Sequence, residues 1–183
     1  MAELPKSKTA DRRTLILMRH AKSSWADSGM DDHSRPLNDR GRSSAPLIAN
    51  WLAEQNLIPE LILCSTAIRT LQTAAILRNT WTSMNNADVI QVDCGDLYLA
   101  TPNGILECLA KRCPTDPMPG KVLLLGHNPG SELLASILCG QIVTMPTAAC
   151  VVFDLDTRNQ SSWKIDLSAG GISKTKQVSP KGL

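Results

Sequence analysis

Residues 14–22 read TLILMRHAK, and this stretch decides how the rest of the chain is interpreted. Its first part, Thr14–Met18, is an almost entirely apolar run. The run ends at the polar residues Arg19, His20 and Lys22. A short apolar run bounded in this way is typical of a strand that is buried on both faces of a sheet. We therefore predict a buried strand whose carboxyl end carries guanidinium, imidazole and ammonium groups.

Two later apolar runs are also followed by polar residues. These runs are Leu61–Cys64 and Val122–Leu125. Arg69 lies in the first helical turn expected after the former, and His127 follows the latter by two residues. In open α/β sheets, ligands bind in the crevice beyond the carboxyl ends of the strands. We therefore expect Arg69 and His127 to lie near His20 at one edge of the sheet.

Helical patterns alternate with these apolar runs. Four helices are predicted, beginning near Gly41, at a Ser65 or Thr66 cap, at a Thr101 cap, and at the pair Asn128-Pro129. The second is expected to face inward through Ile68, Leu71 and Ala75, and the fourth to stop at Gly140. Three further strands are expected at Val89–Val92, Ala148–Asp154 and Ser162–Leu167, the last two as a hairpin or edge pair. This order predicts an α/β protein, a three-layer α/β/α sandwich with a mostly parallel central sheet and helices on both faces.

The length and composition fit one globular domain. The chain has 183 residues, of which 43% are hydrophobic and 20% charged. Domains usually hold about 100–200 residues, so we expect a single domain over residues 1–183. Its polar ends, at about 1–12 and 172–183, are expected to be flexible tails.

Charge, aromatic content and cysteine usage exclude several classes of protein. A net charge of +2 and an aromatic content of 3% argue against nucleic-acid and membrane partners. No apolar run approaches the roughly 20 residues of a transmembrane helix, and the polar N-terminus lacks the apolar part of a secretory signal. The six cysteines form no CxxC pair and lie mostly in apolar stretches, which predicts free buried thiols in a cytoplasmic protein.

The residues expected at the sheet edge suit a phosphoryl group. Arg19 and Arg69 offer guanidinium forks that bind phosphate oxygens in pairs. His20 and His127 offer imidazoles, which are nucleophilic when neutral and have an ordinary pKa of about 6.5. Activity is therefore expected to fall below about pH 6, or lower where the arginines depress the pKa of His20. P-loop, GxGxxG, HExxH and GxSxG motifs are absent from the sequence.

Four sequence blocks together are similar to a known family. They are, in chain order, LILMRHAKSSW, SRPLNDRG, LILCSTAIRTLQTA and LLLGHNPG. They resemble the histidine phosphatase superfamily, which is phosphoglycerate mutase-like, and within it the SixA-like phosphohistidine phosphatase group. The resemblance extends from about Thr14 to Leu167. It implies a phosphatase that needs no metal or other cofactor and acts on phosphohistidine in a phosphorylated protein.

The resemblance also implies a role for each main site residue. His20 would attack phosphorus and become a transient phosphohistidine. Arg19 and Arg69 would clamp the non-bridging oxygens, and His127 would donate a hydrogen bond to the phosphoryl group. Water would then hydrolyse the phosphorylated enzyme. Such donors act on charge as it develops in the transition state.

Three further residues lie in or beside these sequence blocks. Arg35, in the RPL element, is expected either to support the phosphate pocket and contact substrate or to form an ion pair that holds the long loop. Lys22 is a further candidate for substrate binding. His33 is expected at the surface rather than in contact with substrate. The family's common RHG triplet is RHA here, with Ala21, as SixA-like members often have it.

The general acid of larger family members has no obvious counterpart. The segment that would carry it reads GDLYLATP, with Asp96 nearby, and the long loop offers Asp27, Asp31 and Asp32. We expect these carboxylates to be solvated or to cap turns. Protonation of a poor leaving group typically gives 10²–10⁴-fold in rate. A site without an acid would still release the readily protonated nitrogen of phosphohistidine, while hydrolysing phosphate esters slowly.

Two alternative functions remain open from the sequence. One is a phosphomonoesterase for a small phosphorylated metabolite. The other is a non-catalytic module that binds phosphorylated groups. The sequence leaves the oligomeric state and the physiological substrate open.

Overall fold

The fold is built on one six-stranded sheet. The computed structural model describes residues 12–84, 89–115, 118–156, 162–167 and 171–183. The strands are β1 (Arg12–Arg19), β2 (Leu61–Ser65), β3 (Ile90–Cys94), β4 (Lys121–Gly126), β5 (Cys150–Asp156) and β6 (Ile172–Val178). The helices are α1 (Asp39–Glu54), α2 (Ile68–Ser83), α3 (Pro102–Arg112) and α4 (Gly130–Cys139), with short 3-10 helices η2 (Asp32–Ser34) and η3 (Gly95–Leu97).

The strands lie in the order β3-β2-β4-β1-β5-β6. β4 pairs in parallel with β1 on one side and β2 on the other, and β2 also pairs in parallel with β3. β5 runs antiparallel to both β1 and β6. The sheet is therefore mostly parallel, as predicted. Arg19 at the end of β1 lies in register with Gly126 at the end of β4, which places the residues that follow them side by side.

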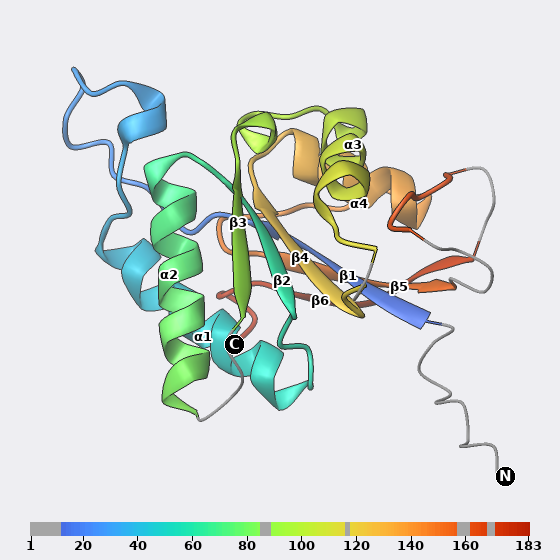
Figure 1. Ribbon diagram of the computed structural model, residues 1–183. Helices are drawn as coiled ribbons and strands as arrows, with labels where there is room; N and C mark the ends of the chain where they lie inside the picture. The colour runs from blue at the N-terminus through green and yellow to red at the C-terminus, as the bar shows by residue number, and fades with distance from the viewer. Residues whose placement is uncertain (1–11, 85–88, 116–117, 157–161, 168–170) are drawn as a thin grey trace, which may run out of the picture.

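Helices cover both faces of this sheet (Figure 1). Successive residues of β1 alternate between two hydrophobic cores. Ile16 and Met18 join the core beneath α1 and α2, whereas Leu15 and Leu17 join the core beneath α3 and α4. A strand buried on both faces needs apolar residues at every position, which explains the run in the sequence. The predicted three-layer α/β/α sandwich is confirmed.

The C-terminal part of the sheet differs from the prediction. Residues 172–178, expected in a flexible tail, form the edge strand β6, and the expected strand Ser162–Leu167 is irregular. The sequence of β6, ISKTKQV, buries only Val178 fully, so its exposed lysines and polar residues resemble a tail. Trp163 instead buries its ring and donates a hydrogen bond from Nε1 to the carbonyl oxygen of Pro119 (3.0 Å). Of the predicted N-terminal tail, residues 1–11 lie outside the described residues, and Arg12 begins β1.

The inward face of α2 was predicted wrongly at two of three positions. Leu71 is half-buried and packs against the core as expected, whereas Ala75 and Ile68 are exposed, the latter at 36%. The buried residues are Arg69, Thr70, Thr73, Ala74, Leu77 and Trp81. This stripe begins with a charged and a hydroxyl side chain because its first turn faces the cluster of polar residues at the sheet edge, so hydrophobic spacing alone selects the wrong face.

The cap of α2 differs from the prediction for a related reason. The helix begins after Ala67, which makes no side-chain capping bond. The hydroxyls of Ser65 and Thr66 hydrogen-bond to imidazole rings instead. Two other predicted helix ends are confirmed: Thr101 accepts from the Gly104 N–H, and α4 stops at Gly140 in the left-handed conformation. The predicted Asn128 cap of α4 is wrong, because the helix begins after Pro129 and the Asn128 amide donates to Glu132 and to the Met145 carbonyl oxygen instead.

Membrane-spanning helices and disulfide bonds are both absent from the described part of the chain. No helix in it is long and apolar enough to cross a membrane. All six cysteines lie within it and are free, and all are buried except the half-buried Cys139. The predicted free thiols are therefore confirmed.

Candidate active site

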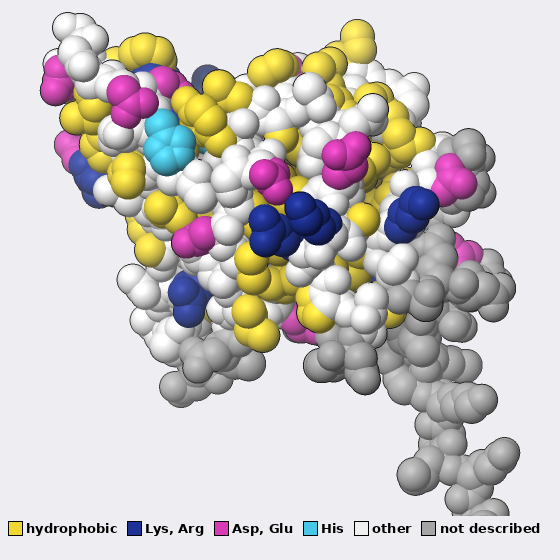
Figure 2. Space-filling model, turned by 45° about the horizontal axis from the view of Figure 1, so that its top comes forward, with side chains coloured by type: hydrophobic (Ala, Val, Ile, Leu, Met, Phe, Trp, Pro, Cys, Tyr) yellow, Lys and Arg dark blue, Asp and Glu magenta, His cyan; other side chains and the backbone are white. Residues whose placement is uncertain are grey.

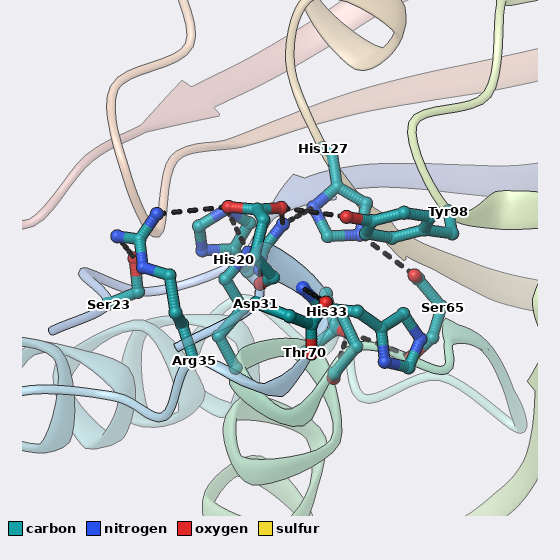
Figure 3. Close-up of polar contacts among 12 residues, drawn as sticks. His20, Ser23, Asp31, His33, Arg35, Ser65, Thr70, Tyr98 and His127 are labelled. Atoms are coloured by element: carbon teal, nitrogen blue, oxygen red, sulfur yellow. Dashed lines mark hydrogen bonds and ion pairs between the residues drawn. The ribbon is translucent and has the colours of Figure 1, made fainter. Parts of the chain in front are cut away.

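Three predicted site residues come together at the carboxyl ends of the parallel strands. The Nε of Arg69 lies 3.2 Å from Nε2 of His20, and its Nη2 lies 3.2 Å from Nδ1 of His127. The two imidazole rings are 5.1 Å apart between centroids. Figure 3 shows the rings of His20 and His127 side by side, with Arg35 on the opposite side of the cluster. A cavity of about 260 Å³ opens over this cluster and is also lined by Arg19.

His20 is held in one tautomer by the chain around it. Its Nδ1 lies 2.7 Å from the carbonyl oxygen of Ala21, an acceptor that requires an N–H at this nitrogen. The other ring nitrogen, Nε2, faces the N–H donor of Arg69 and therefore carries a lone pair. Burial, and then the charges of Arg69 and Arg19, lower the pKa of His20 to about 4, although its bond to Ala21 opposes this shift. His20 is neutral at pH 7, and its Nε2 lone pair accepts the Nε–H of Arg69, which lines the same cavity.

His127 is neutral for similar reasons. Burial, followed by its proximity to His20 and Arg69, lowers its pKa to about 3. Its Nδ1 faces the donor Nη2 of Arg69, and its Nε2 lies 2.8 Å from the buried hydroxyl of Ser65. Because Nη2 can only donate, the proton of His127 lies on Nε2 in this arrangement and Ser65 accepts it. The hydroxyl of Ser65 could donate to the other tautomer once Arg69 turns away from Nδ1.

Arg69 is surrounded by acceptors. Its Nη1 donates to the backbone carbonyl of Asp32, and its Nη2 lies 2.9 Å from the Asp32 carboxylate. The same carboxylate accepts from Tyr98 Oη (2.8 Å) and pairs with Arg35 (2.9 Å). A phosphoryl group that binds Arg69 must therefore displace part of this contact with Asp32.

Arg19 lines the same cavity with fewer partners. Its Nη1 donates to the carbonyl oxygen of Met145 (2.9 Å), while its buried Nε has no hydrogen-bond partner among the described residues. Burial lowers its pKa from 12.5, an effect partly offset by Glu132. A buried N–H without a partner is costly in most proteins and often marks the binding site of an ion or ligand. An anion in the adjoining cavity would provide one.

Arg35 and Lys22 both line the cavity, as expected of residues near the substrate. Arg35 is buried and donates to the carbonyl oxygen of Ser24 (2.9 Å), to the hydroxyl of Ser23 (3.0 Å) and to Asp32. The ion pair that was one of its two expected roles is therefore present. Substrate contact by Arg35 and Lys22 stays a prediction.

Comparisons with known proteins agree with this geometry. Residues 15–97 match the model of the histidine phosphatase superfamily, branch 1. The chain is 27% identical to phosphohistidine phosphatase SixA of Escherichia coli over 171 residues, which cover 90% of this chain and 99% of that protein. A SixA structure from Agrobacterium tumefaciens superposes with a TM-score of 0.73 at 26% identity, covering 92% of this chain and 98% of that one.

The chain belongs to the histidine phosphatase superfamily. An uncharacterised chloroplast protein of Arabidopsis thaliana is also similar, with 33% identity over 141 residues. That match covers 76% of this chain but only 65% of the plant protein. Membership of this superfamily places the chain among phosphatase enzymes, with the phosphoglycerate mutase-like fold that the SixA structures share.

Two glycines of the histidine phosphatase motifs are explained by close packing. A Cβ on Gly41 would lie 2.2 Å from the carbonyl oxygen of Lys22, and one on Gly130 would lie 1.8 Å from that of Ala100. Gly41 thus lets α1 approach the segment after His20. Gly130 lets the start of α4 approach the segment after β3, which brings Tyr98 against His127 with their ring centroids 5.4 Å apart.

Three of the four acid candidates lie outside the cavity lining. Asp27 accepts from the N–H of Gly29 (2.9 Å), Asp31 caps η2, and Asp96 pairs at 3.6 Å with Arg112. These are the turn and surface roles that we expected. Asp32 does line the cavity, but hydrogen bonding from Tyr98 and the charges of Arg69 and Arg35 lower its pKa despite the opposing effect of burial. It is ionised at pH 7 and has no proton to donate.

His33 is half-buried rather than freely exposed. Its Nε2 lies 3.0 Å from the Thr66 hydroxyl, and its ring packs edge-on against Tyr98 with centroids 4.8 Å apart. It is absent from the cavity lining. Its expected lack of contact with substrate stays a prediction, and its role in the structure is to support Tyr98.

Sequence reasoning missed the partners of the main site residues. Ser65 was predicted only as a helix cap, whereas its side chain binds His127. Tyr98, Trp25 and Leu99 were not singled out, yet Tyr98 binds Asp32 and the other two line the cavity. The position of Ser65 directly after a buried strand, beside the arginine of the same block, is a signal that could have found it.

The cavity lining carries the cationic side chains of Arg19, Lys22, Arg35 and Arg69 against the carboxylate of Asp32. Figure 2 shows acidic and basic side chains interspersed with hydrophobic ones on the face turned toward the viewer. The described residues contain no group of three or more His, Cys, Asp or Glu side chains arranged to hold a metal ion.

Proposed function

We propose that the protein hydrolyses phosphohistidine carried by another protein, using His20 as a nucleophile. The observation that most supports this is the state of His20. A hydrogen bond to Ala21 holds its proton on Nδ1, and burial keeps it neutral, so that Nε2 offers a lone pair at pH 7. A neutral imidazole beside two arginines is suited to attack a phosphoryl group and to carry it briefly.

The reaction has two steps. The lone pair of His20 Nε2 forms a bond to phosphorus as the bond from phosphorus to the leaving nitrogen breaks. That electron pair stays on the leaving imidazole, which is released with one proton from solvent. Water then attacks phosphorus, the bond to Nε2 breaks, and inorganic phosphate is released with His20 restored.

The charges around the cavity stabilise the transferring group. Arg69 and the unpartnered Nε of Arg19 would bind the non-bridging oxygens, where negative charge is spread during transfer. His127 would donate one hydrogen bond from Nδ1 in the tautomer in which Ser65 donates to Nε2. Asp32 would leave Arg69 when the anion enters, because both cannot occupy the same N–H groups.

The proposed leaving group rests on the cavity lining, in which the described residues include no protonated carboxyl group. Asp32 is the carboxylate of the cavity lining that approaches Arg69, and it is ionised. A phosphate ester would then leave as a costly alkoxide, whereas phosphohistidine releases a nitrogen that accepts a proton easily. The cavity volume of about 260 Å³ lies just below the roughly 300–1,000 Å³ of common small-molecule sites, so the cavity has room for a phosphoryl group and part of its carrier.

Labelling with a ³²P-phosphohistidine peptide tests this function. We expect wild-type protein to acquire an acid-labile label that is absent from the His20→Ala variant. We also expect faster turnover of the phosphohistidine peptide than of a phosphoserine peptide. Faster ester hydrolysis, or preference for one compound in a panel of phosphorylated metabolites, would overturn the substrate. A wild type that never labels, with phosphate binding equal to that of His20→Ala, would indicate a non-catalytic binding module.

A further inference from the structure

Two exposed apolar side chains border the cavity that contains His20. Trp25 is 72% exposed and Leu99 is 53% exposed, yet both line the cavity together with His20, Arg69 and His127. They come from different segments, one after β1 and the other after β3. Exposed tryptophans are unusual on a surface without a partner and are frequent among residues that dominate binding.

Trp25 stacks on the guanidinium group of a buried arginine. The guanidinium carbon of Arg35 lies 3.1 Å from the centroid of the Trp25 ring, and Arg35 is itself buried. Three hydrogen-bonding partners, Ser23, Ser24 and Asp32, hold Arg35 in this position. One face of the indole is therefore occupied by a fixed cation, while most of the side chain stays open to solvent.

Leu99 is held in a conformation that leucine rarely adopts. Its φ of 51° lies in the left-handed region, which favours glycine. The neighbouring Tyr98 is fixed by its hydrogen bond to Asp32 and by ring contacts with His33 and His127. Residues in such conformations gather at ligand sites, where the surrounding structure maintains them. Here the unfavourable backbone conformation places an aliphatic side chain at the edge of the cavity.

The chemistry of the proposed substrate fits these two residues. In phosphohistidine the phosphorus is bonded directly to a flat imidazole ring. When the phosphoryl group lies against His20 and the arginines, that ring is within one bond of it and must lie at the cavity mouth. A phosphoserine would place only an oxygen and a methylene group there.

We propose that Trp25 and Leu99 are specificity-determining residues that hold the imidazole ring of phosphohistidine at the mouth of the cavity. This rests on the proposed function. The open part of the indole stacks on the imidazole or meets it edge-on, as aromatic pairs do. Leu99 contacts the ring as an aliphatic neighbour and excludes water from the bond that breaks.

The test compares two substrates that share a phosphorus–nitrogen bond. Free phosphohistidine contains the ring, and phosphoramidate lacks it. We expect Trp25→Ala to lower the ratio of kcat/KM for phosphohistidine to kcat/KM for phosphoramidate about tenfold. Leu99→Gly, which suits the positive φ, should lower the ratio about threefold. Trp25→Phe should retain most of the preference, because it keeps an aromatic face.

Ile142→Ala provides a matched control, since Ile142 is 91% exposed and does not line the cavity. It should leave the ratio unchanged. Equal losses on both substrates in Trp25→Ala, or no loss, would overturn the inference while wild type still labels on His20 and hydrolyses phosphohistidine. A wild type that hydrolyses neither compound and never labels would overturn the proposed function, and this inference with it.

Discussion

The floor and the mouth of the cavity are built in different ways. The floor consists of Arg19, His20, Arg69 and His127, which lie at the ends of strands or in the first turn of a helix. The histidines and Arg69 are each less than 9% exposed. Backbone carbonyls and neighbouring side chains hold these groups, so their positions follow from the rigid sheet.

The mouth is carried by loops and is open to solvent. Trp25 and Asp32 lie between β1 and α1, and Leu99 lies between β3 and α3. In Figure 1 the former loop extends beyond the amino end of α2. We infer that the residues of the floor transfer the phosphoryl group, whereas the residues of the mouth select which phosphorylated group binds. Asp32 connects the two regions, because it belongs to the loop and binds Arg69 of the floor.

The largest effect is expected from removing the nucleophile in the floor. His20→Ala should lower kcat/KM on a phosphohistidine peptide by at least about 10³-fold, because no other side chain replaces the covalent step. His33→Ala is the matched control, since His33 lies outside the cavity lining, and it should retain most of the activity. Steady-state kinetics measure both. Substantial turnover by His20→Ala would contradict the assignment of the covalent step to His20 in the floor.

A smaller but still large effect is expected from the arginine of the floor. Arg69→Ala should lower kcat/KM by about 10²–10³-fold, the scale seen when one donor to a transition-state anion is removed. Arg69→Lys keeps the charge but loses the planar fork, and should recover only part of this loss. Arg42→Ala changes an arginine on the exposed side of α1 and should have little effect. Unchanged turnover in Arg69→Ala would contradict the clamp.

The floor should also make the protein sensitive to acid. The folded-state pKa of His20, about 4, lies below its ordinary 6.5, so the unfolded chain takes up a proton between these values while the folded protein does not. Stability is therefore lost as pH falls from about 6.5 toward 4, by about 3 kcal/mol for this group. Urea unfolding at pH 7 and pH 4 should show this loss in wild type beyond that in His20→Asn. Equal losses of stability in wild type and His20→Asn would mean that the pKa of His20 lies near its ordinary value.

The same pKa changes the expected pH range of activity. The sequence predicted a fall below about pH 6, from the ordinary imidazole pKa. Because burial, more than the arginines, keeps His20 neutral, its contribution to activity should persist to about pH 4.

The smallest effect is expected where the mouth meets the floor. Asp32→Asn removes a negative charge that competes with phosphate for Arg69, so inorganic phosphate should inhibit about threefold to fivefold more tightly. Asp31→Asn is the matched control, because Asp31 caps η2 and does not line the cavity. Inhibition constants measure the difference. Weaker inhibition in Asp32→Asn would mean that the carboxylate organises the site rather than competing with the ligand.

Much of the fold was predictable because its strands are locally distinct. The runs within β1, β2 and β4 are almost entirely apolar, and a helix follows each of them. β6 was not predictable, since an exposed edge strand with ISKTKQV has almost no apolar pattern and forms only by pairing with β5. The face of α2 was predicted wrongly because the helix turns polar residues toward the site, which a hydrophobicity pattern cannot anticipate.

The sequence by itself determined the class of fold and the four groups of the floor. It did so because the polar residues directly follow buried strands, and parallel strands end at a common edge. Only the tertiary structure decided the tautomer and neutrality of His20, the pairing of His127 with Ser65, and the occupation of Arg69 by Asp32. These depend on burial and on contacts between residues 37 to 62 positions apart in the chain, which a local pattern does not encode, together with the bond from His20 to the carbonyl oxygen of its neighbour Ala21.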